Sequence, residues 1–322
     1  MILILSSIDD QATIDVIRWL CYLNSENVIR LNDADRLLIE CIAVKEDGTE
    51  IIVRLLPDDK IIALHKATSF WYRRGQWNFY VPKTEAPKLD AALRREIKSV
   101  EGFINNFFNR FSQRIGSYQE NFLSKLTCLL AARSVGLKIP ETLITSHKHS
   151  LNKDLKASKA ISDIMVTTEE GDIMGLGTIL IDSEQLRKAP DFFFPTLFQR
   201  YISKAYELRI FYLHGKLWSM AIFSQNNEKT KIDFRNYDHE KPNRTVPYLL
   251  PTCIEDKLLL LMKQLKLTNG SIDMVVDHFG DFYFLEVNPI GQFSQVSTPC
   301  NYYLEKEIAT FLSTSFSNRA KT

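Results

Sequence analysis

The chain has 322 residues, of which 45% are hydrophobic, so it can bury a sizeable core and is long enough for two or three subdomains. Its 40 Lys and Arg residues balance 39 Asp and Glu residues, and the resulting net charge of +1 disfavours a dedicated nucleic-acid-binding protein. No apolar run approaches the roughly 18 residues of a membrane span, and the N-terminus lacks the basic start of a signal peptide. The five cysteines are scattered without any CxxC spacing, as is typical of free thiols. We therefore expect a cytoplasmic protein that binds neither nucleic acid nor membrane.

Residues 1–116 are predicted to form a mixed α/β domain. It begins with a buried strand at residues 2–5, and a helix follows whose apolar face carries Ile14, Ile17, Leu20 and Leu23. The other predicted elements are strands at 28–31, 37–44 and 51–55, a hairpin turn at Asp47-Gly48, and a helix at 89–110. Residues 70–77 mix aromatic side chains with arginine. This mixture is typical of proteins that bind single-stranded nucleic acid, but also of packing inside a domain, and the near-neutral net charge favours packing.

Residues 117–202 are predicted to form a central subdomain. Its first helix is expected to end at Gly136 and to bury an apolar stripe of Phe122, Leu126, Leu129 and Leu130. Strands are predicted at 139–145, 155–161, 164–168 and 178–181, with a turn at 170–172. The aromatic residues 192–194 are expected to pack in the core or in an interface, and His147 and His149 to lie in a solvated loop.

Residues 203–322 are predicted to form a third part, which opens with a hairpin. Its strands are expected at 207–213 and 216–223, on either side of a His214-Gly215 turn. A long polar loop, a helix and a C-terminal helix are predicted at 224–251, 253–266 and 303–314.

Between these two helices lies a second hairpin with polar residues on apolar strands. Its strands are predicted at 271–276 and 282–289, and alternation places Glu286 and Asn288 on one face. Asp273 can lie beside Glu286, although the sequence leaves the register open. Acidic residues often just end strands, but polar groups inside an apolar segment are costly to bury unless they are paired or bound to a metal. Hard oxygen ligands without His or Cys suit Mg²⁺ that also contacts the phosphates of a nucleotide.

Candidate nucleotide-binding residues precede this hairpin in a consistent order. Lys125 lies in the first turns of a helix, Lys159 lies near the end of a strand, and Glu207 and Arg209 share a strand face. The segment 198–202 connects two subdomains and can offer backbone groups to adenine. Each residue alone is weak evidence, because a helix lysine is usually solvated and Arg209 could simply pair with Glu207. Their order therefore carries the prediction.

This order of motifs resembles that of the ATP-grasp superfamily: a helix Lys, a strand Lys, an adenine linker, a Glu-x-Arg strand, and an Asp followed by Glu-x-Asn. The resemblance covers roughly residues 117–300. Within the superfamily the chain looks closest to the macrocycle-forming peptide ligases of the microviridin (graspetide) type. The segments that carry this likeness are 69–74, 136–145, 198–209, 231–238 and 242–248. The last two resemble the branch that is paired with "grasp-with-spasm" precursor peptides.

The resemblance implies an α/β (α+β) ATP-grasp fold with a pre-ATP-grasp domain at 1–116 and two ATP-clamping subdomains at 117–202 and 203–322. It implies that Asp273, Glu286 and Asn288 hold Mg²⁺. The residues it assigns to ATP are Lys125, Lys159, Gln199, Tyr201, Ile202, Glu207 and Arg209. The residues it assigns to catalysis are Arg209, Asp233, Arg235 and Arg244. Arg200 stands where the family linker often carries Glu, which leaves Gln199 or Glu207 for the nucleotide hydroxyl groups.

The activity that the resemblance implies is ATP-dependent closure of ω-ester or ω-amide rings in a ribosomally made precursor peptide, which has a leader and a Thr/Glu-rich core. The resemblance is also compatible with a homodimer. Two other readings stay open on the sequence alone. One is an ATP-grasp ligase for another carboxylate and amine, such as a glutathione synthetase, and the other is a nucleotide-binding scaffold without catalysis. The complete set of Asp273, Glu286 and Asn288 argues against the scaffold.

Overall fold

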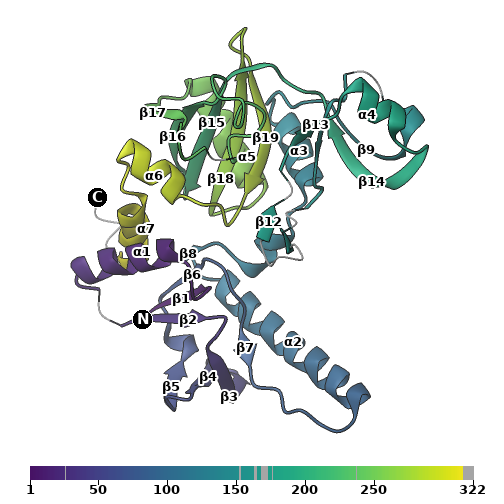
Figure 1. The fold of residues 1–322 in the computed structure, drawn as a ribbon. Coiled ribbons are helices and arrows are strands. Elements are labelled where there is room, and N and C mark those ends of the chain that lie inside the picture. Colours follow the sequence, from purple (N-terminus) through teal and green to yellow (C-terminus); the bar gives the residue numbers. More distant parts are fainter. Residues whose placement is uncertain are drawn as a thin grey trace. The chain divides into compact units, whose positions relative to one another are not determined.

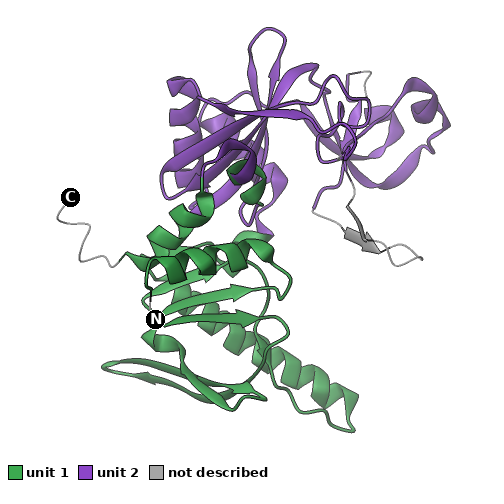
Figure 2. Ribbon diagram, turned by 60° about the vertical axis from the view of Figure 1, so that its left-hand side comes forward, with its two compact units in different colours: residues 1–121, 292–297, 303–322 green, residues 122–291, 298–302 purple. Residues whose placement is uncertain are grey.

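The computed structural model describes residues 1–25, 27–151, 154–162, 165–167, 173–175, 177–236 and 238–314, and Figure 1 shows their helices and strands. The chain forms two compact units, coloured separately in Figure 2. Unit 1 comprises residues 1–121, 292–297 and 303–322, and unit 2 comprises residues 122–291 and 298–302. The three-part division at residues 116 and 202 is finer than these units and stays a prediction. Among the described residues, no helix is both long and apolar enough to span a membrane.

Unit 1 is built on a parallel sheet. Its strands, in spatial order, are β2 (Val28–Asn32), β1 (Ile2–Ser6), β6 (Ser69–Tyr72) and β8 (Arg114–Ile115). Its helices are α1 (Gln11–Tyr22), α2 (Pro87–Asn109) and α7 (Leu304–Ser313), and α7 packs on α1 and on β6. Strand β1, which is apolar from Ile2 to Leu5 and ends at Ser6, is buried along its whole length because it lies inside a parallel sheet. Phe70, Trp71, Tyr72 and Trp77 are also buried, so the packing interpretation of residues 70–77 is confirmed.

A second sheet completes unit 1. Its strands, in spatial order, are β5 (Lys60–Ala63), β4 (Gly48–Leu56), β3 (Arg36–Lys45) and β7 (Asn78–Phe79). Lys45 pairs with Gly48 across the β3–β4 turn, which confirms the predicted hairpin at Asp47-Gly48. The short 3₁₀ segments of the chain are η1 (Leu64–Lys66), η2 (Tyr118–Phe122) and η3 (Lys148–Ser150).

Unit 2 contains a small antiparallel sheet. Its strands, in spatial order, are β13 (Ile179–Leu180), β10 (Ala157–Lys159), β14 (Phe192–Gln199) and β9 (Thr142–His147), and α4 (Ser183–Lys188) precedes β14. A separate ribbon pairs β11 (Met165–Thr167) with β12 (Ile173–Gly175), and the turn predicted at 170–172 lies outside the described residues. Phe192 is 71% exposed and Phe194 83%, so these two side chains do not pack in the core, and their packing in an interface stays a prediction. His147 and His149 are exposed as expected, although His147 ends β9 instead of lying in a loop.

The large sheet of unit 2 carries most of its core. Its strands, in spatial order, are β17 (Arg244–Tyr248), β16 (Lys216–Phe223), β15 (Lys204–Leu213), β18 (Asn269–Asp277) and β19 (Phe282–Asn288). The helices α3 (Lys125–Ser134) and α5 (Thr252–Gln264) contribute to the same core, and α6 (Ser294–Cys300) follows β19. The stripe predicted for α3 is largely wrong. Phe122, Leu126 and Leu130 are exposed, because Cys128, Leu129, Ala131 and Ala132 face the core instead.

Candidate active site

A pocket in unit 2 gathers most of the residues singled out from the sequence. Its walls come from the ends of β10, β14 and β15, from the loop after β16, and from the middle of β18 and β19. The predicted site residues that line it are Lys159, Gln199, Tyr201, Ile202, Glu207, Asp233, Arg235, Asp273 and Glu286. Segments that are far apart in the sequence therefore meet around one cavity.

The register of the acidic hairpin brings its carboxylates together. Asp273 on β18 pairs directly with Glu286 on β19, and Ser271 pairs with Asn288. Directly paired residues of an antiparallel ladder point to the same face, so this register aligns the two carboxylates. Asn288 lies on the Glu286 face by alternation, and its side-chain oxygen accepts a hydrogen bond from the N–H of Ile290 at 3.0 Å.

Glu286 lies at the centre of three cations. Its Oε2 is 3.2 Å from Nζ of Lys159 and 3.7 Å from Nζ of Lys125, and its Oε1 is 3.4 Å from the guanidinium of Arg235. Burial alone would raise the pKa of Glu286, but the three positive charges outweigh it and lower this pKa to about 2. The carboxylate is therefore ionised at neutral pH, and the lysines predicted to bind phosphate lie next to it.

Asp273 has a different partner. One terminal nitrogen of Arg209, which is the paired residue on β15, donates to both carboxylate oxygens of Asp273 at 2.5 and 2.6 Å. Burial raises the pKa of Asp273, and the charge of Arg209 opposes this rise. The Nε of Arg209 is buried and has no hydrogen-bond acceptor among the described residues. The sequence had offered Glu207 as the partner of Arg209, and the structure places Asp273 there instead.

Asp233 and Arg235 form a second ion pair at the pocket. Arg235 donates to Asp233 from Nε at 2.8 Å and from a terminal nitrogen at 2.7 Å, and the N–H of Thr178 donates to Asp233 at 3.2 Å. Burial opposes ionisation of Asp233, but these bonds prevail and lower its pKa to about 2. Arg235 is thus fixed by Asp233 on one side and reaches Glu286 on the other.

The segment between β14 and β15 forms another wall of the pocket. Gln199 ends β14 and donates to the hydroxyl of Thr142 at 2.8 Å, and Tyr201 and Ile202 follow it. Glu207 is buried, accepts a hydrogen bond from Ser224 at 2.6 Å, and has a raised pKa because of burial. These residues combine an apolar surface with buried polar groups, as is typical of small-molecule sites.

Lys204 lines the same pocket and was missed from the sequence. Its side chain lies 2.9 Å from Glu207 and donates to the carbonyl of Ile232 at 2.9 Å. Strict alternation would place residues 204 and 207 on opposite faces of a strand. The register shift between Lys204 and Tyr206 brings them together, and nothing in the sequence marks that irregularity.

Comparison with solved structures shows the same architecture elsewhere. A ligase from Chryseobacterium gregarium, described as RiPP-associated and bound to ADP with a leader and core peptide, superposes with a TM-score of 0.79. It is 24% identical, and the match covers 97% of this chain and 96% of that one. The chain has the ATP-grasp fold.

Two further structures with this fold match over almost their full length. The macrocyclase MdnC from Microcystis aeruginosa, bound with its precursor peptide MdnA, has a TM-score of 0.73 at 23% identity and covers 97% of this chain and 99% of its own. The ATP-grasp ligase PsnB, complexed with a minimal precursor, Mg and ADP, has a TM-score of 0.69 at 14% identity and covers 97% and 96%. No protein-family model matches the sequence, and neither does any curated protein.

The hairpin of this ATP-grasp fold has a donor set that fits Mg²⁺. Asp273, Glu286 and Asn288 supply two carboxylates and one amide oxygen, which are hard ligands of the kind that Mg²⁺ prefers. Across the described ranges, no group of three His, Cys, Asp or Glu side chains offers a competing site. Lys159, Lys125 and Arg235 place positive charge beside this donor set, which suits a phosphate group.

Arg244, predicted to be catalytic, lies elsewhere. It begins β17, where its guanidinium lies 5.4 Å from the ring centre of Phe223. Both residues line a second pocket of unit 2, formed mainly by residues 226–229 and 241–244. Lys125 is also outside the lining of the first pocket, but it reaches that pocket's Glu286.

Proposed function

We propose that the protein is an ATP-dependent carboxylate ligase that closes ω-ester or ω-amide rings in a ribosomally made precursor peptide. The observation that carries the proposal is the convergence of Lys125, Lys159 and Arg235 on Glu286, directly opposite Asp273. Such a set of carboxylates and cations suits a metal-bound nucleoside triphosphate. The likeness to MdnC and to the Chryseobacterium ligase supports the peptide as substrate.

Lys125 and Lys159 would hold the phosphates of ATP, and the wall of Gln199, Tyr201, Ile202 and Glu207 would receive the nucleoside. Asp273, Glu286 and Asn288 would hold Mg²⁺, which neutralises phosphate charge when it is bound. Arg209 and Arg235 approach the same face from β15 and from the loop after β16. Carboxylates hold both arginines in place. The two side chains can therefore stabilise the negative charge of the transition state without an entropic cost for ordering them during the reaction.

In the first step, an oxygen of an Asp or Glu side chain of the peptide attacks the terminal phosphorus of ATP. The bond to the bridging oxygen breaks, ADP leaves, and an acyl phosphate forms. In the second step, a Thr or Ser hydroxyl, or a Lys amine, attacks the acyl carbon. The carbon–oxygen bond to phosphate breaks, and inorganic phosphate leaves as the nucleophile loses its proton to solvent. Each ring therefore consumes one ATP and removes one water from the peptide. Catalysis consists of positioning and charge neutralisation, with no protein nucleophile.

Arg235 has the geometry for a role near the acceptor carboxylate. Two of its nitrogens are fixed by Asp233, and the remaining terminal nitrogen reaches toward Glu286 across the pocket. The fork of the guanidinium is thus occupied by Asp233, and the remaining terminal nitrogen is the donor that can orient the acyl group for attack. Arg244 lies outside this pocket, in the second pocket beside Phe223, and would contact another part of the peptide.

Mass spectrometry of a peptide product tests the proposal. The purified protein is incubated with ATP, Mg²⁺ and a Thr/Ser- and Asp/Glu-rich peptide encoded beside its gene. We expect the peptide to lose one water mass per ring and the reaction to release an equal amount of ADP. Omission of ATP, or the Glu286→Gln variant, should abolish both signals. ADP release without loss of water from the peptide would point to another acceptor, and nucleotide binding without ADP release would point to a scaffold.

A further inference from the structure

The parallel sheet of unit 1 has the edge at which open α/β folds bind ligands. From β1 the chain passes through α1 to β2 on one side, whereas β6 lies on the other side of β1. The direction of winding therefore reverses between β1 and β6. In open α/β sheets, ligands bind outside the carboxyl ends of the strands at such a switch point. Here the loops that leave those ends are residues 7–10 and 73–77.

The loop after β6 is fastened to the end of β1. The backbone N–H groups of Arg73 and Arg74 both donate to the carbonyl of Leu5, at 2.9 and 3.2 Å. Gly75 follows with a φ of +87°, and a Cβ at this position would lie only 2.6 Å from the carbonyl oxygen of Ser6. The backbone of Arg74 is therefore held against the end of β1, because only glycine permits this approach.

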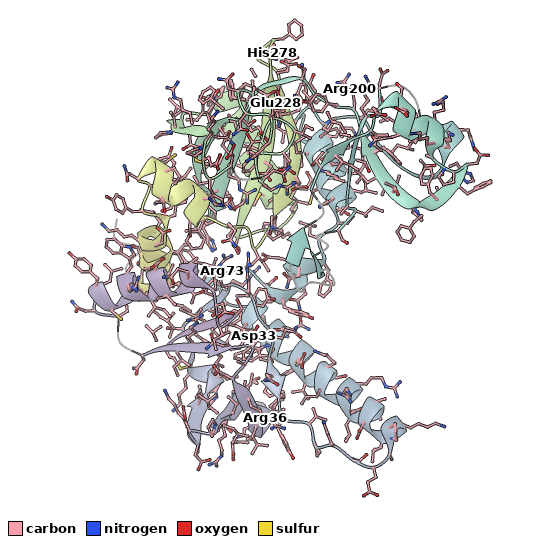
Figure 3. All side chains as sticks on the ribbon, viewed as in Figure 1. Asp33, Arg36, Arg73, Arg200, Glu228 and His278 are labelled. Carbon is pink, nitrogen blue, oxygen red and sulfur yellow. The ribbon has the colours of Figure 1, made fainter. Side chains whose placement is uncertain are left out.

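The two adjacent arginines have opposite environments. Arg73, labelled in Figure 3, is buried, with its Nε 2.9 Å from Asp10 and a terminal nitrogen donating to Gln292 at 3.1 Å. Its charge is neutralised within unit 1. Arg74 is half-buried, and its guanidinium makes no hydrogen bond or ion pair with any residue in the described ranges. A half-buried charge without a partner costs free energy, which a bound anion would recover.

A further arginine adds positive charge at this edge. Arg30 donates to the hydroxyl of Ser6 and to the carbonyl of Ser7, both at 2.7 Å, so its partners are neutral. Two of the nearby acids already accept backbone hydrogen bonds. Asp33 accepts from Ile8 and Asp35 from Asn32.

We propose that Arg74 is a substrate-binding residue that holds an acidic side chain of the peptide at the carboxyl edge of this sheet. The proposal rests on the proposed function for the identity of the ligand. A guanidinium fork matches a carboxylate through two parallel hydrogen bonds. Under the proposed function, Lys125 and Lys159 of unit 2 bind the phosphates of ATP. The other anionic group among the substrates is the acidic side chain of the peptide, which we therefore assign to Arg74.

The test compares the full-length wild type with Arg74→Gln, Arg74→Lys and a control, Arg95→Gln. Arg95 is an exposed arginine of α2 in the same unit. With the precursor peptide, Arg74→Gln should raise the KM for peptide roughly tenfold and leave kcat and the KM for ATP within about twofold. Arg74→Lys should recover part of the loss, and Arg95→Gln should match the wild type. Replacing the responsible Glu of the peptide by Gln should cost the same factor in the wild type and nothing further in Arg74→Gln.

A binding measurement keeps this test separate from the ligase activity. A fluorescent hexaglutamate peptide is titrated into each variant without ATP, and circular dichroism confirms that each variant is folded. Weaker binding by Arg74→Gln alone would support the subsite even if no peptide lost water. Equal binding by wild type and Arg74→Gln, or none by the wild type, would overturn it. A loss of inorganic phosphate or ADP affinity instead would also overturn it, because the subsite would then belong to the nucleotide.

Discussion

Asp273 lies directly opposite Glu286 in the β18–β19 ladder, yet the two carboxylates are neutralised from different directions. Arg209 on the neighbouring strand β15 holds Asp273 through both oxygens. Lys159, Lys125 and Arg235 reach Glu286 from a strand, a helix and a loop. Like charges this close would repel, so the cations stabilise the hairpin. Three predictions test this arrangement and its supports, and a fourth tests the packing of a loop in unit 1.

Replacement of Glu286 by Gln should reduce ATP-dependent turnover at least about a hundredfold. The amide keeps the size of the side chain but removes the charge that Lys159 and Lys125 now face. Release of ADP in the presence of Mg²⁺ and peptide measures the effect. Glu184→Gln, at an exposed position on α4, should behave like the wild type. If Glu286→Gln turned over ATP within tenfold of the wild-type rate, Glu286 would not be a metal ligand.

Arg209→Met should destabilise the protein by about 3–5 kcal/mol, because it leaves Asp273 buried without its cation. Urea unfolding followed by fluorescence measures this change in the free energy of unfolding. The control is Arg18→Met, which removes an ion pair with Asp15 in which Arg18 is 71% exposed, and it should cost less than about 1 kcal/mol. If the two variants were equally stable, the Asp273–Arg209 pair would contribute no more than a surface pair.

The ion pair of Asp233 should add stability that depends on pH. Its pKa is lowered to about 2, against burial, by bonds that include those from Arg235. A carboxyl with a depressed pKa stabilises the folded state fully above its unfolded pKa and loses that contribution as pH falls through the folded value. Asp233→Asn should therefore cost about 1–2 kcal/mol at pH 6, allowing for solvent screening of the half-exposed Arg235.

The same cost should shrink by about half at pH 3, which lies between the unfolded and folded pKa values. Urea unfolding of both proteins from pH 6 to pH 3 provides the measurement. The difference between them is the informative quantity, because other carboxyls titrate alike in both. A difference that stayed constant over this range would mean that Asp233 is not held ionised by its partners.

Gly75→Ala should be more damaging than Gly215→Ala, although both glycines have a φ of +87°. Either change forces alanine into the left-handed region, which costs about 1 kcal/mol. At Gly75 the new Cβ would also meet the carbonyl oxygen of Ser6 at 2.6 Å, whereas Gly215 has nothing within 4 Å. We expect a further loss of about 1–3 kcal/mol for Gly75→Ala. Thermal and urea unfolding give both values, and equal losses would mean that the loop after β6 can move away from the end of β1.

The sequence by itself predicted most of the elements that carry the site. The β18–β19 hairpin, the His214-Gly215 turn and the strand Ile2–Ser6 follow from local patterns: alternation, turn residues and a continuous apolar run. The order of lysines, Arg209 and the acidic hairpin was enough to indicate the ATP-grasp fold. Local patterns failed where exposure depends on neighbours, as for Phe122 and Leu130, both of which were expected in an apolar stripe and face solvent.

Only the tertiary structure decided how these residues are paired. The β15–β18 register joins Arg209 to Asp273 instead of Glu207, and a register shift puts Lys204 beside Glu207. The different environments of Arg73 and Arg74 likewise depend on the contacts of β6 with β1 and with residue 292. A sequence fixes the spacing along one chain, whereas ion pairs depend on distances between strands. Those distances are set by the order of the strands in the sheet and by the positions of bulges that shift their register. Neither the strand order nor the register can be predicted from any single segment of the sequence.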